Sequence, residues 1–220
     1  QEVSEVGSYF SIIKAIAAGN HKLSTIAAVL EVKSTNLTKY LKTLMDLDIL
    51  ERRVPVTEEN PEKSKRGLYK IKDNYLRFWF AFIYPNMSFI ESGYSGIVMD
   101  KIHRGLTTSH IGFVYEDICQ ERMWELNVNN AWPFQFSKLG GYWDAKNEID
   151  IAALDPEGKN LILGECKYWK EPVGLNVLHA LEAKACDVAW ERDRRKVWYV
   201  LFSISGFSDE LRNHAATRDD

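Results

Sequence analysis

Asp150, Glu165 and Lys167 are the residues whose types and spacing best suit chemistry on a phosphodiester. The aspartate interrupts a pair of isoleucines, and the glutamate and lysine end an apolar run. An aspartate on one strand and Glu-x-Lys on the next can bring two carboxylates and an ammonium group together. Mg²⁺ takes oxygen ligands, usually one or two carboxylates with substrate phosphate and waters. We therefore predict a Mg²⁺ or Mn²⁺ site at which the lysine orients or deprotonates the attacking water.

The register of the expected hairpin decides whether these side chains meet. If residues 156–159 form a four-residue turn, Leu154 pairs with Leu161 and Asp150 faces Glu165. Alternate residues of a strand share one face, so Lys167 then lies on the same side as both acids. A loop one residue longer or shorter would turn the acids to opposite faces.

The elements around the hairpin predict the fold of the second half. We expect a helix over 111–126, strands over 134–139, 148–154 and 161–168, a helix over 175–190, a strand over 196–202 and helix from 208 onward. This αβββαβ order is the minimal order of the restriction-endonuclease-like α/β fold, which makes the whole chain α+β. Glu116, with Glu121 behind it, is the expected third metal-ligating and catalytic carboxylate from the preceding helix.

The first 73 residues predict a winged helix-turn-helix domain. Apolar residues recur at helical spacing in three short blocks, and a short connection joins the second and third. Two extended segments, 49–56 and 67–71, flank a polar link typical of a β-wing.

In a DNA-binding winged helix, the third helix enters the major groove and the wing contacts the backbone. The candidate nucleic-acid-binding residues are Ser34, Thr35, Asn36, Thr38, Lys39 and Lys42 on the helix and Arg52, Arg53, Lys63, Lys65 and Arg66 on the wing. This part of the chain holds only slightly more basic than acidic residues, so a solvated polar face on a protein-interaction module is an equal alternative.

We expect residues 74–110 to be an aromatic helical connector between the domain of residues 1–73 and the nuclease-like domain of residues 111–220. The rings at 75, 78, 79 and 82 would share one helix face, and we expect them to fill a core between the two domains rather than to stack on bases. Residues 92–108 are expected to be a loop and the start of a helix.

Composition excludes several classes of protein. The chain has 220 residues, a net charge of −3 and 27% charged residues, as in an ordinary folded cytoplasmic protein. Three separated cysteines suit reduced thiols, and no apolar run is long enough to span a membrane. There is no phosphate-binding loop of the GxxxxGK[ST] type, and a first residue other than methionine leads us to expect a piece of a longer protein.

Three separated segments resemble the C-terminal region of the archaeal-type AAA+-like ATPases. They are LTKYLKTLMDLDILERRVPVTE (37–58), DNYLRFWFAFIYPN (73–86) and the pair GGYWDAKNEIDIAAL (140–154) and ILGECKYWKEPVG (162–174). In that family a winged helix precedes the domain of unknown function 234, regarded as a divergent PD-(D/E)XK nuclease-like module. The resemblance implies an ATP-binding domain outside this chain as intramolecular partner, and it aligns Glu116, Asp150, Glu165 and Lys167 with the nuclease-type positions.

Three functions remain open on the residues alone. The first is a Mg²⁺-dependent nuclease that a winged helix places on nucleic acid, most naturally DNA. The second is a nuclease fold without catalysis that serves as a regulatory or protein-interaction module. The third is a transcription regulator.

Overall fold

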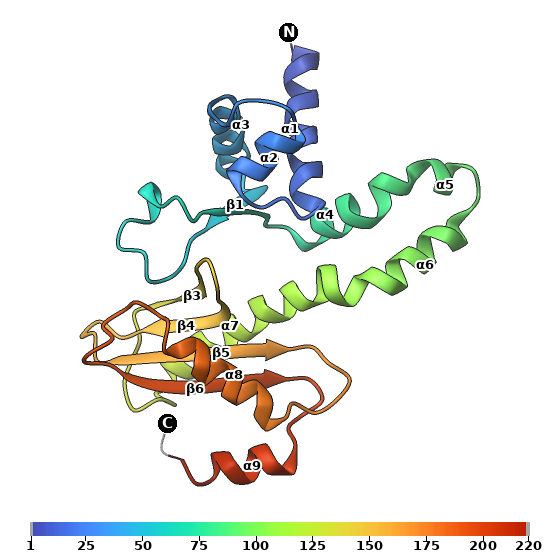
Figure 1. The fold of residues 1–220 in the computed structure, drawn as a ribbon. Coiled ribbons are helices and arrows are strands. Elements are labelled where there is room, and N and C mark those ends of the chain that lie inside the picture. Colours follow the sequence, from blue (N-terminus) through green and yellow to red (C-terminus); the bar gives the residue numbers. More distant parts are fainter. Residues whose placement is uncertain (1, 219–220) are drawn as a thin grey trace. The chain divides into compact units, whose positions relative to one another are not determined.

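The computed structural model describes residues 2–218 as a mixed α+β protein with two compact units (Figure 1). The helical unit contains residues 1–54 and 60–110, so the segment 74–110 belongs to it. The sheet unit contains residues 55–59 and 111–220. Within residues 2–218, no helix is long and apolar enough to cross a membrane.

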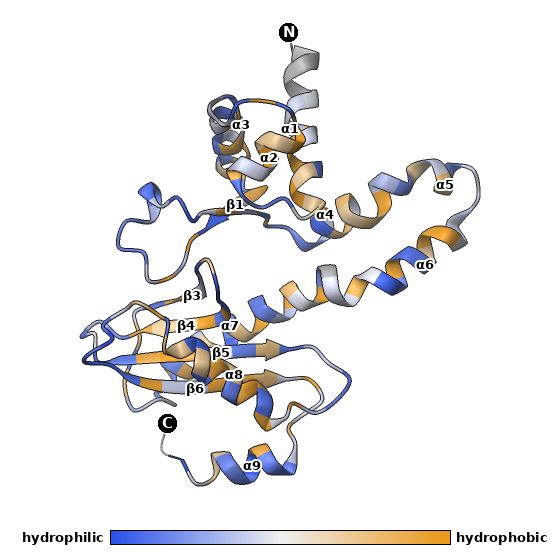
Figure 2. Ribbon diagram, in the orientation of Figure 1, coloured by the Kyte–Doolittle hydropathy of each residue, from blue (hydrophilic) through white to orange (hydrophobic). Residues whose placement is uncertain are grey.

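Three helices begin the helical unit at the positions that the apolar periodicity predicts, and a two-stranded sheet follows, whose first strand ends at Arg53 rather than at 56. The helices are α1 (Glu2–Ala17), α2 (Leu23–Val29) and α3 (Ser34–Asp46). Strands β1 (Leu50–Arg53) and β2 (Leu68–Ile71) pair antiparallel. Buried aliphatic side chains such as Ile12, Ile26 and Leu41 hold the three helices together. Figure 2 shows most of the segment between β1 and β2 in hydrophilic colours.

The aromatic segment continues the helical unit as one run of short helical turns. The run comprises α4 (Asn74–Phe78), η2 (Trp79–Ile83), η3 (Tyr84–Asn86) and α5 (Met87–Glu91). The η2 turn is a π-helix, which inserts an extra residue and rotates the following side chains.

Rings of this run pack against α1. Phe10 of α1 contacts Trp79, Phe80 and Tyr84 at 5.0–6.4 Å between ring centroids, so these rings complete the core of the helical unit itself. The prediction of one face that includes position 75 was wrong, because Tyr75 is 69% exposed. The segment 92–108, expected to be a loop and the start of a helix, is mostly helix α6 (Ser95–Leu106), whose buried Val98 and Ile102 pack on Phe82.

A mixed four-stranded sheet forms the sheet unit, in the order β3-β4-β5-β6. Its strands are β3 (Lys138–Trp143), β4 (Glu148–Leu154), β5 (Asn160–Lys167) and β6 (Lys196–Ser203). The first three are antiparallel neighbours, and β5 and β6 run parallel. The helices are α7 (Gly112–Val128), α8 (Leu175–Ala185) and α9 (Asp209–Ala215), so the predicted αβββαβ element order is confirmed.

The central strands are buried on both faces. On one face Ala152, Leu161 and Leu163 pack with Leu181 of α8. On the other face Ile151 and Ile162 pack with Met123 of α7, in the same cluster as Cys119 and Cys166. Side chains on the two faces of β4 and β5 therefore meet different helices. The face on which a polar side chain lies decides which helix it can contact.

Two predicted boundaries in the sheet unit were wrong. The first strand begins at Lys138 rather than at 134, because the Asn127 side chain donates to the Phe136 carbonyl and accepts from its N–H, both at 3.0 Å. These bonds replace the strand pairing that the alternation of 134–139 predicts. Helix α8 ends at Ala185 rather than at 190, where the Arg195 guanidinium donates to the Ala185 carbonyl at 2.8 Å.

Candidate active site

The β4–β5 hairpin has the register that the turn length predicts. Leu154 pairs with Leu161 and Ile151 with Gly164, and the Asp155 N–H donates to the Asn160 carbonyl at 3.2 Å. The turn occupies residues 156–159, with Gly158 at a φ of +72°. The hairpin therefore brings the open ends of both strands together, on the edge where Asp150 and Glu165 lie.

Asp150, Glu165 and Lys167 converge just beyond the last paired residues of the hairpin, Ile151 and Gly164. The Lys167 ammonium lies 2.5 Å from Glu165 Oε2 and 3.6 Å from Asp150 Oδ2. The Cys166 N–H donates to Asp150 Oδ2 at 2.8 Å, which fixes the aspartate across the strand pair. Glu165 is only 5% exposed, so these contacts form largely out of water.

Lys184 is a fourth member of the cluster, and the sequence reasoning missed it. From the last turn of α8 its ammonium lies 2.6 Å from Glu165 Oε1 and donates to the Glu148 carbonyl at 2.7 Å. Both oxygens of Glu165 thus contact an ammonium group. A sequence signal was present, since Lys184 stands at the margin of the apolar face of α8, next to Ala185 and three residues after Leu181.

Burial and the four charges set the protonation of the two acids in opposite directions. Burial, and then the charge of Glu165, raise the pKa of Asp150 above its usual value. Burial alone would also raise the pKa of Glu165, but the hydrogen bonds and charges of Lys167 and Lys184 outweigh it and lower that pKa. Burial likewise opposes the charge of Lys167, yet the two carboxylates raise its pKa. Glu165 is therefore the anionic centre, and Asp150 the acid that most readily keeps a proton.

Glu116 lies on α7, the helix that packs on the opposite face of the sheet from α8. Its charge and that of Asp150 both act on Cys119 and Cys166, which pack on the α7 side of the sheet. Glu165 alternates with Cys166 and meets Lys184 of α8. Helix α7 also contributes Gln120, whose side-chain amide donates to the Asp150 carbonyl at 3.3 Å.

The acids offer a small set of metal ligands. In residues 2–218, no three His, Cys, Asp or Glu side chains group closely enough to bind a metal ion. Asp150 and Glu165 nevertheless interact directly, and two carboxylates completed by waters and substrate phosphate fit the usual ligand set of Mg²⁺. A metal there would compete with Lys167 and Lys184 for the same oxygens.

The predicted nucleic-acid-binding residues lie in two environments of the helical unit. On α3, Thr35, Asn36, Thr38, Lys39 and Lys42 are exposed and Ser34 is half-buried. Leu37, Leu41 and Leu44 fill the other face of that helix, so its outer face is free of core packing.

The arginines of the β1–β2 segment are held within the protein. Arg52 donates to the carbonyls of Pro61 and Ser64, and Arg53 forms an ion pair with Glu51 at 2.5 Å. Lys63, Lys65 and Arg66 are exposed on the hydrophilic loop. Within this segment, the lysines and Arg66 are therefore better placed than Arg52 and Arg53 to meet an external phosphate.

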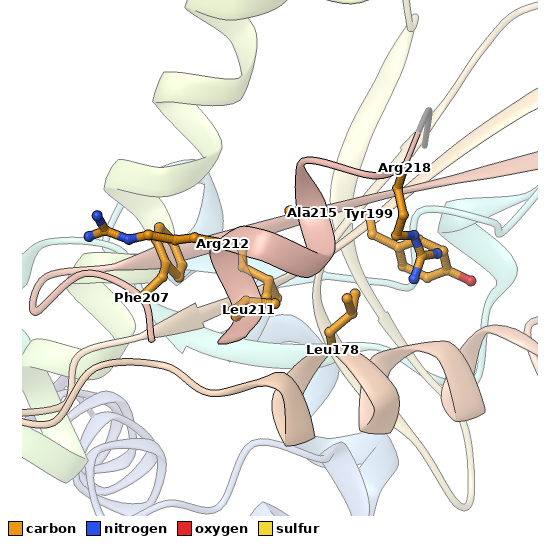
Figure 3. A pocket seen from close by; sticks show the side chains of 8 residues that line it. Leu178, Tyr199, Phe207, Leu211, Arg212, Ala215 and Arg218 are labelled. Atoms are coloured by element: carbon orange, nitrogen blue, oxygen red, sulfur yellow. The ribbon is translucent and has the colours of Figure 1, made fainter. Parts of the chain in front are cut away.

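A separate cavity of about 220 Å³ lies between α8, β6 and α9. Figure 3 shows Leu178 and Leu211 facing each other across it, with Arg218 beside the ring of Tyr199. Arg218 forms an ion pair with Glu182, and the lining is otherwise mainly apolar. Ligand pockets usually have about 300–1,000 Å³ and several convergent polar groups. This cavity is smaller and lacks such a set, so the Asp150–Glu165–Lys167–Lys184 cluster is the candidate site.

Comparison with known proteins finds similarity to a family of unknown function over part of this chain. Residues 79–185 match the model of DUF234, described as archaea bacterial proteins of unknown function. The chain is also 41% identical, over 170 residues, to an uncharacterized protein of Methanocaldococcus jannaschii. That alignment covers 77% of this chain and 37% of the relative, so the chain spans little more than a third of the relative's length. No solved structure matches the chain.

Proposed function

We propose that the site at the open end of the β4–β5 hairpin hydrolyses phosphodiester bonds of nucleic acid with the help of Mg²⁺ or Mn²⁺. The observation that carries this proposal is the convergence of Asp150, Glu165 and Lys167 within 3.6 Å in a largely buried corner of the sheet. The αβββαβ element order around it suits a restriction-endonuclease-like module.

Each residue has a distinct role in this proposal. Asp150 and Glu165 would hold the metal, which supplies a Lewis acid for the phosphoryl group and lowers the pKa of a bound water. Lys167 lies between the two carboxylates, and its ammonium can orient the attacking water and offset negative charge that develops on the phosphate oxygens. Lys184 holds the second oxygen of Glu165 and so orients its carboxylate.

A matched pair in the same hairpin makes this proposal testable. Glu157 and Lys159 repeat the Glu-x-Lys spacing at the turn, where both side chains are 68% exposed. With labelled DNA and RNA at millimolar Mg²⁺ or Mn²⁺, Glu165→Gln and Lys167→Met should each lower the cleavage rate by at least about 100-fold. Glu157→Gln and Lys159→Met should leave it unchanged. Equal cleavage by wild type and Glu165→Gln would identify a contaminating nuclease and refute the proposal.

The second candidate is a nuclease-fold module without catalysis that regulates an attached ATPase domain or binds a protein. Lys184 favours it, because two ammonium groups already neutralise Glu165 without a metal. Calorimetric titration with Mg²⁺ and Mn²⁺ separates the two candidates. The nuclease requires metal binding at or below millimolar concentration, and Glu165→Gln should abolish that binding. The module without catalysis requires no metal binding.

For the helical unit we propose a cytoplasmic winged helix that contacts nucleic acid, preferentially DNA, through α3. Its exposed outer face, with Lys39 and Lys42 among short polar side chains, supports this role and also that of a transcription regulator. A salt-dependent gel shift that Lys39→Ala and Lys42→Ala weaken would support it, and a shift indifferent to both would refute it.

A further inference from the structure

The loop that follows β5 presents an indole beside the candidate site. Trp169 is 46% exposed, and the Lys167 ammonium lies 5.6 Å from the centroid of its ring. Tryptophan is usually well buried, so an indole half in solvent next to a charged cluster is informative. The lysine over its ring is the one that contacts both carboxylates.

Neighbouring contacts hold this loop in place. Tyr168 packs edge-on against Tyr115 of α7 at 5.6 Å between ring centroids. The Ser205 hydroxyl donates to the Trp169 carbonyl, and the Ile204 N–H donates to the Lys167 carbonyl at 3.4 Å. The indole is therefore carried by a loop tied to both α7 and the segment after β6.

The same edge of the sheet carries a second exposed apolar side chain. Strands β5 and β6 run parallel and end side by side (Figure 1), and Ile204, just after β6, is 47% exposed. Ligands of sheets with parallel strands commonly bind beyond the carboxyl ends of those strands. An apolar surface there, next to ammonium groups, matches a ligand with a flat apolar face and a nearby phosphate.

We propose that Trp169 is a stacking platform for an unpaired nucleobase next to the phosphate that the site cleaves, and that it selects single-stranded nucleic acid. This inference rests on the proposed function, which locates the phosphate at Lys167. In a duplex the faces of the bases are covered by their neighbours, whereas an unpaired base offers its face to an aromatic ring. The platform therefore favours single strands and frayed ends.

Binding without cleavage tests the platform. The chain of 220 residues is mixed in EDTA, at one fixed salt concentration, with fluorescein-labelled oligothymidylate and with a labelled hairpin duplex, and anisotropy is recorded. Trp169→Ala should weaken single-strand binding about tenfold, because base–aromatic stacking typically contributes that much per base. Trp169→Phe keeps an aromatic face and should retain most of the affinity. Duplex binding should change less than about twofold.

Trp124→Ala is the matched control, since this tryptophan of α7 is 42% exposed away from the cluster and contacts Phe136. It should bind single strands as wild type does. Circular dichroism of each variant confirms the fold. The inference is overturned if wild type binds no single strand, if folded Trp169→Ala binds as wild type, or if Trp169→Phe loses as much affinity as Trp169→Ala.

The two proposals fail separately in these assays. Single-strand binding that depends on Trp169, without cleavage by wild type at millimolar Mg²⁺ or Mn²⁺, would uphold the platform and refute hydrolysis. Cleavage that depends on Glu165, together with single-strand binding that Trp169→Ala does not change, would uphold hydrolysis and refute the platform.

Discussion

The two ends of the β4–β5 hairpin carry similar residues in opposite circumstances. At the turn, Asp155 is buried and accepts from the Lys159 N–H at 3.0 Å and the Asn160 amide at 2.7 Å, both within five residues. At the open end, Glu165 is buried against an ammonium on a helix 19 residues away. An acid satisfied entirely by its own turn stabilises local structure, whereas Glu165, which contacts both Lys167 of its own strand and the distant Lys184, depends on the packing of the whole sheet unit.

The difference explains why only one end is a candidate site. The turn leaves Glu157 and Lys159 in solvent, where an ion pair is screened and contributes little. The open end keeps Asp150 and Glu165 in contact against their mutual repulsion, and two lysines oppose that repulsion. A bound cation or a cationic group of a substrate would reduce this repulsion. Buried groups of like charge with shifted pKa values occur characteristically at functional sites.

The largest difference in stability between the two ends should come from substituting their glycines, Gly164 and Gly158. A Cβ on Gly164 would lie 2.5 Å from Val200 Cγ1 and 2.9 Å from the Val200 carbonyl oxygen, so Gly164→Ala forces β5 away from β6. We expect a loss of about 3 kcal/mol in the free energy of unfolding, together with displacement of Glu165. Gly158→Ala, at a positive φ in the turn, should lose only about 1 kcal/mol and leave the site intact. Urea denaturation followed by amide exchange in β5 measures both, and equal losses would remove the distinction between the ends.

A smaller difference in free energy should distinguish the ion pair at the open end from the ion pair at the turn. In double-mutant cycles, Glu165→Gln with Lys184→Met should give a coupling energy of about 2 kcal/mol, because the pair is hydrogen-bonded and mostly buried. The cycle of Glu157→Gln with Lys159→Met should give less than about 0.5 kcal/mol. Similar coupling energies in the two cycles would show that burial does not strengthen the open end.

The smallest effect should fall on stability alone. Asp155→Ala leaves the Lys159 N–H and the Asn160 amide without their acceptor, at an expected loss of about 1–2 kcal/mol in the free energy of unfolding. Metal binding measured by calorimetry should be unchanged, since the open end keeps its four side chains. A loss of metal binding as large as that of Glu165→Gln would mean that the turn governs the site.

Sequence reasoning succeeded where interactions are local. Helical periodicity located α1, α2 and α3, and the length of the turn set the register that joins Asp150 to Glu165. It failed where a side chain replaced a backbone bond, as Asn127 does for Phe136, and at Tyr75, which is 69% exposed although its spacing groups it with the rings that follow. Neither outcome leaves a trace in a pattern of apolar residues.

The sequence by itself determined the hairpin, its pairing from Ile151 with Gly164 to Leu154 with Leu161, and the order of elements that supports it. Only the tertiary structure decided which helices reach the open ends of its strands. Helix α8 adds Lys184 to Glu165, while α7 packs on the other side of the sheet and brings Gln120 to Asp150. The physical reason is that side-chain alternation assigns a residue to a face, but the packing of each helix against the sheet assigns its partner. That packing depends on apolar contacts summed over the whole sheet unit.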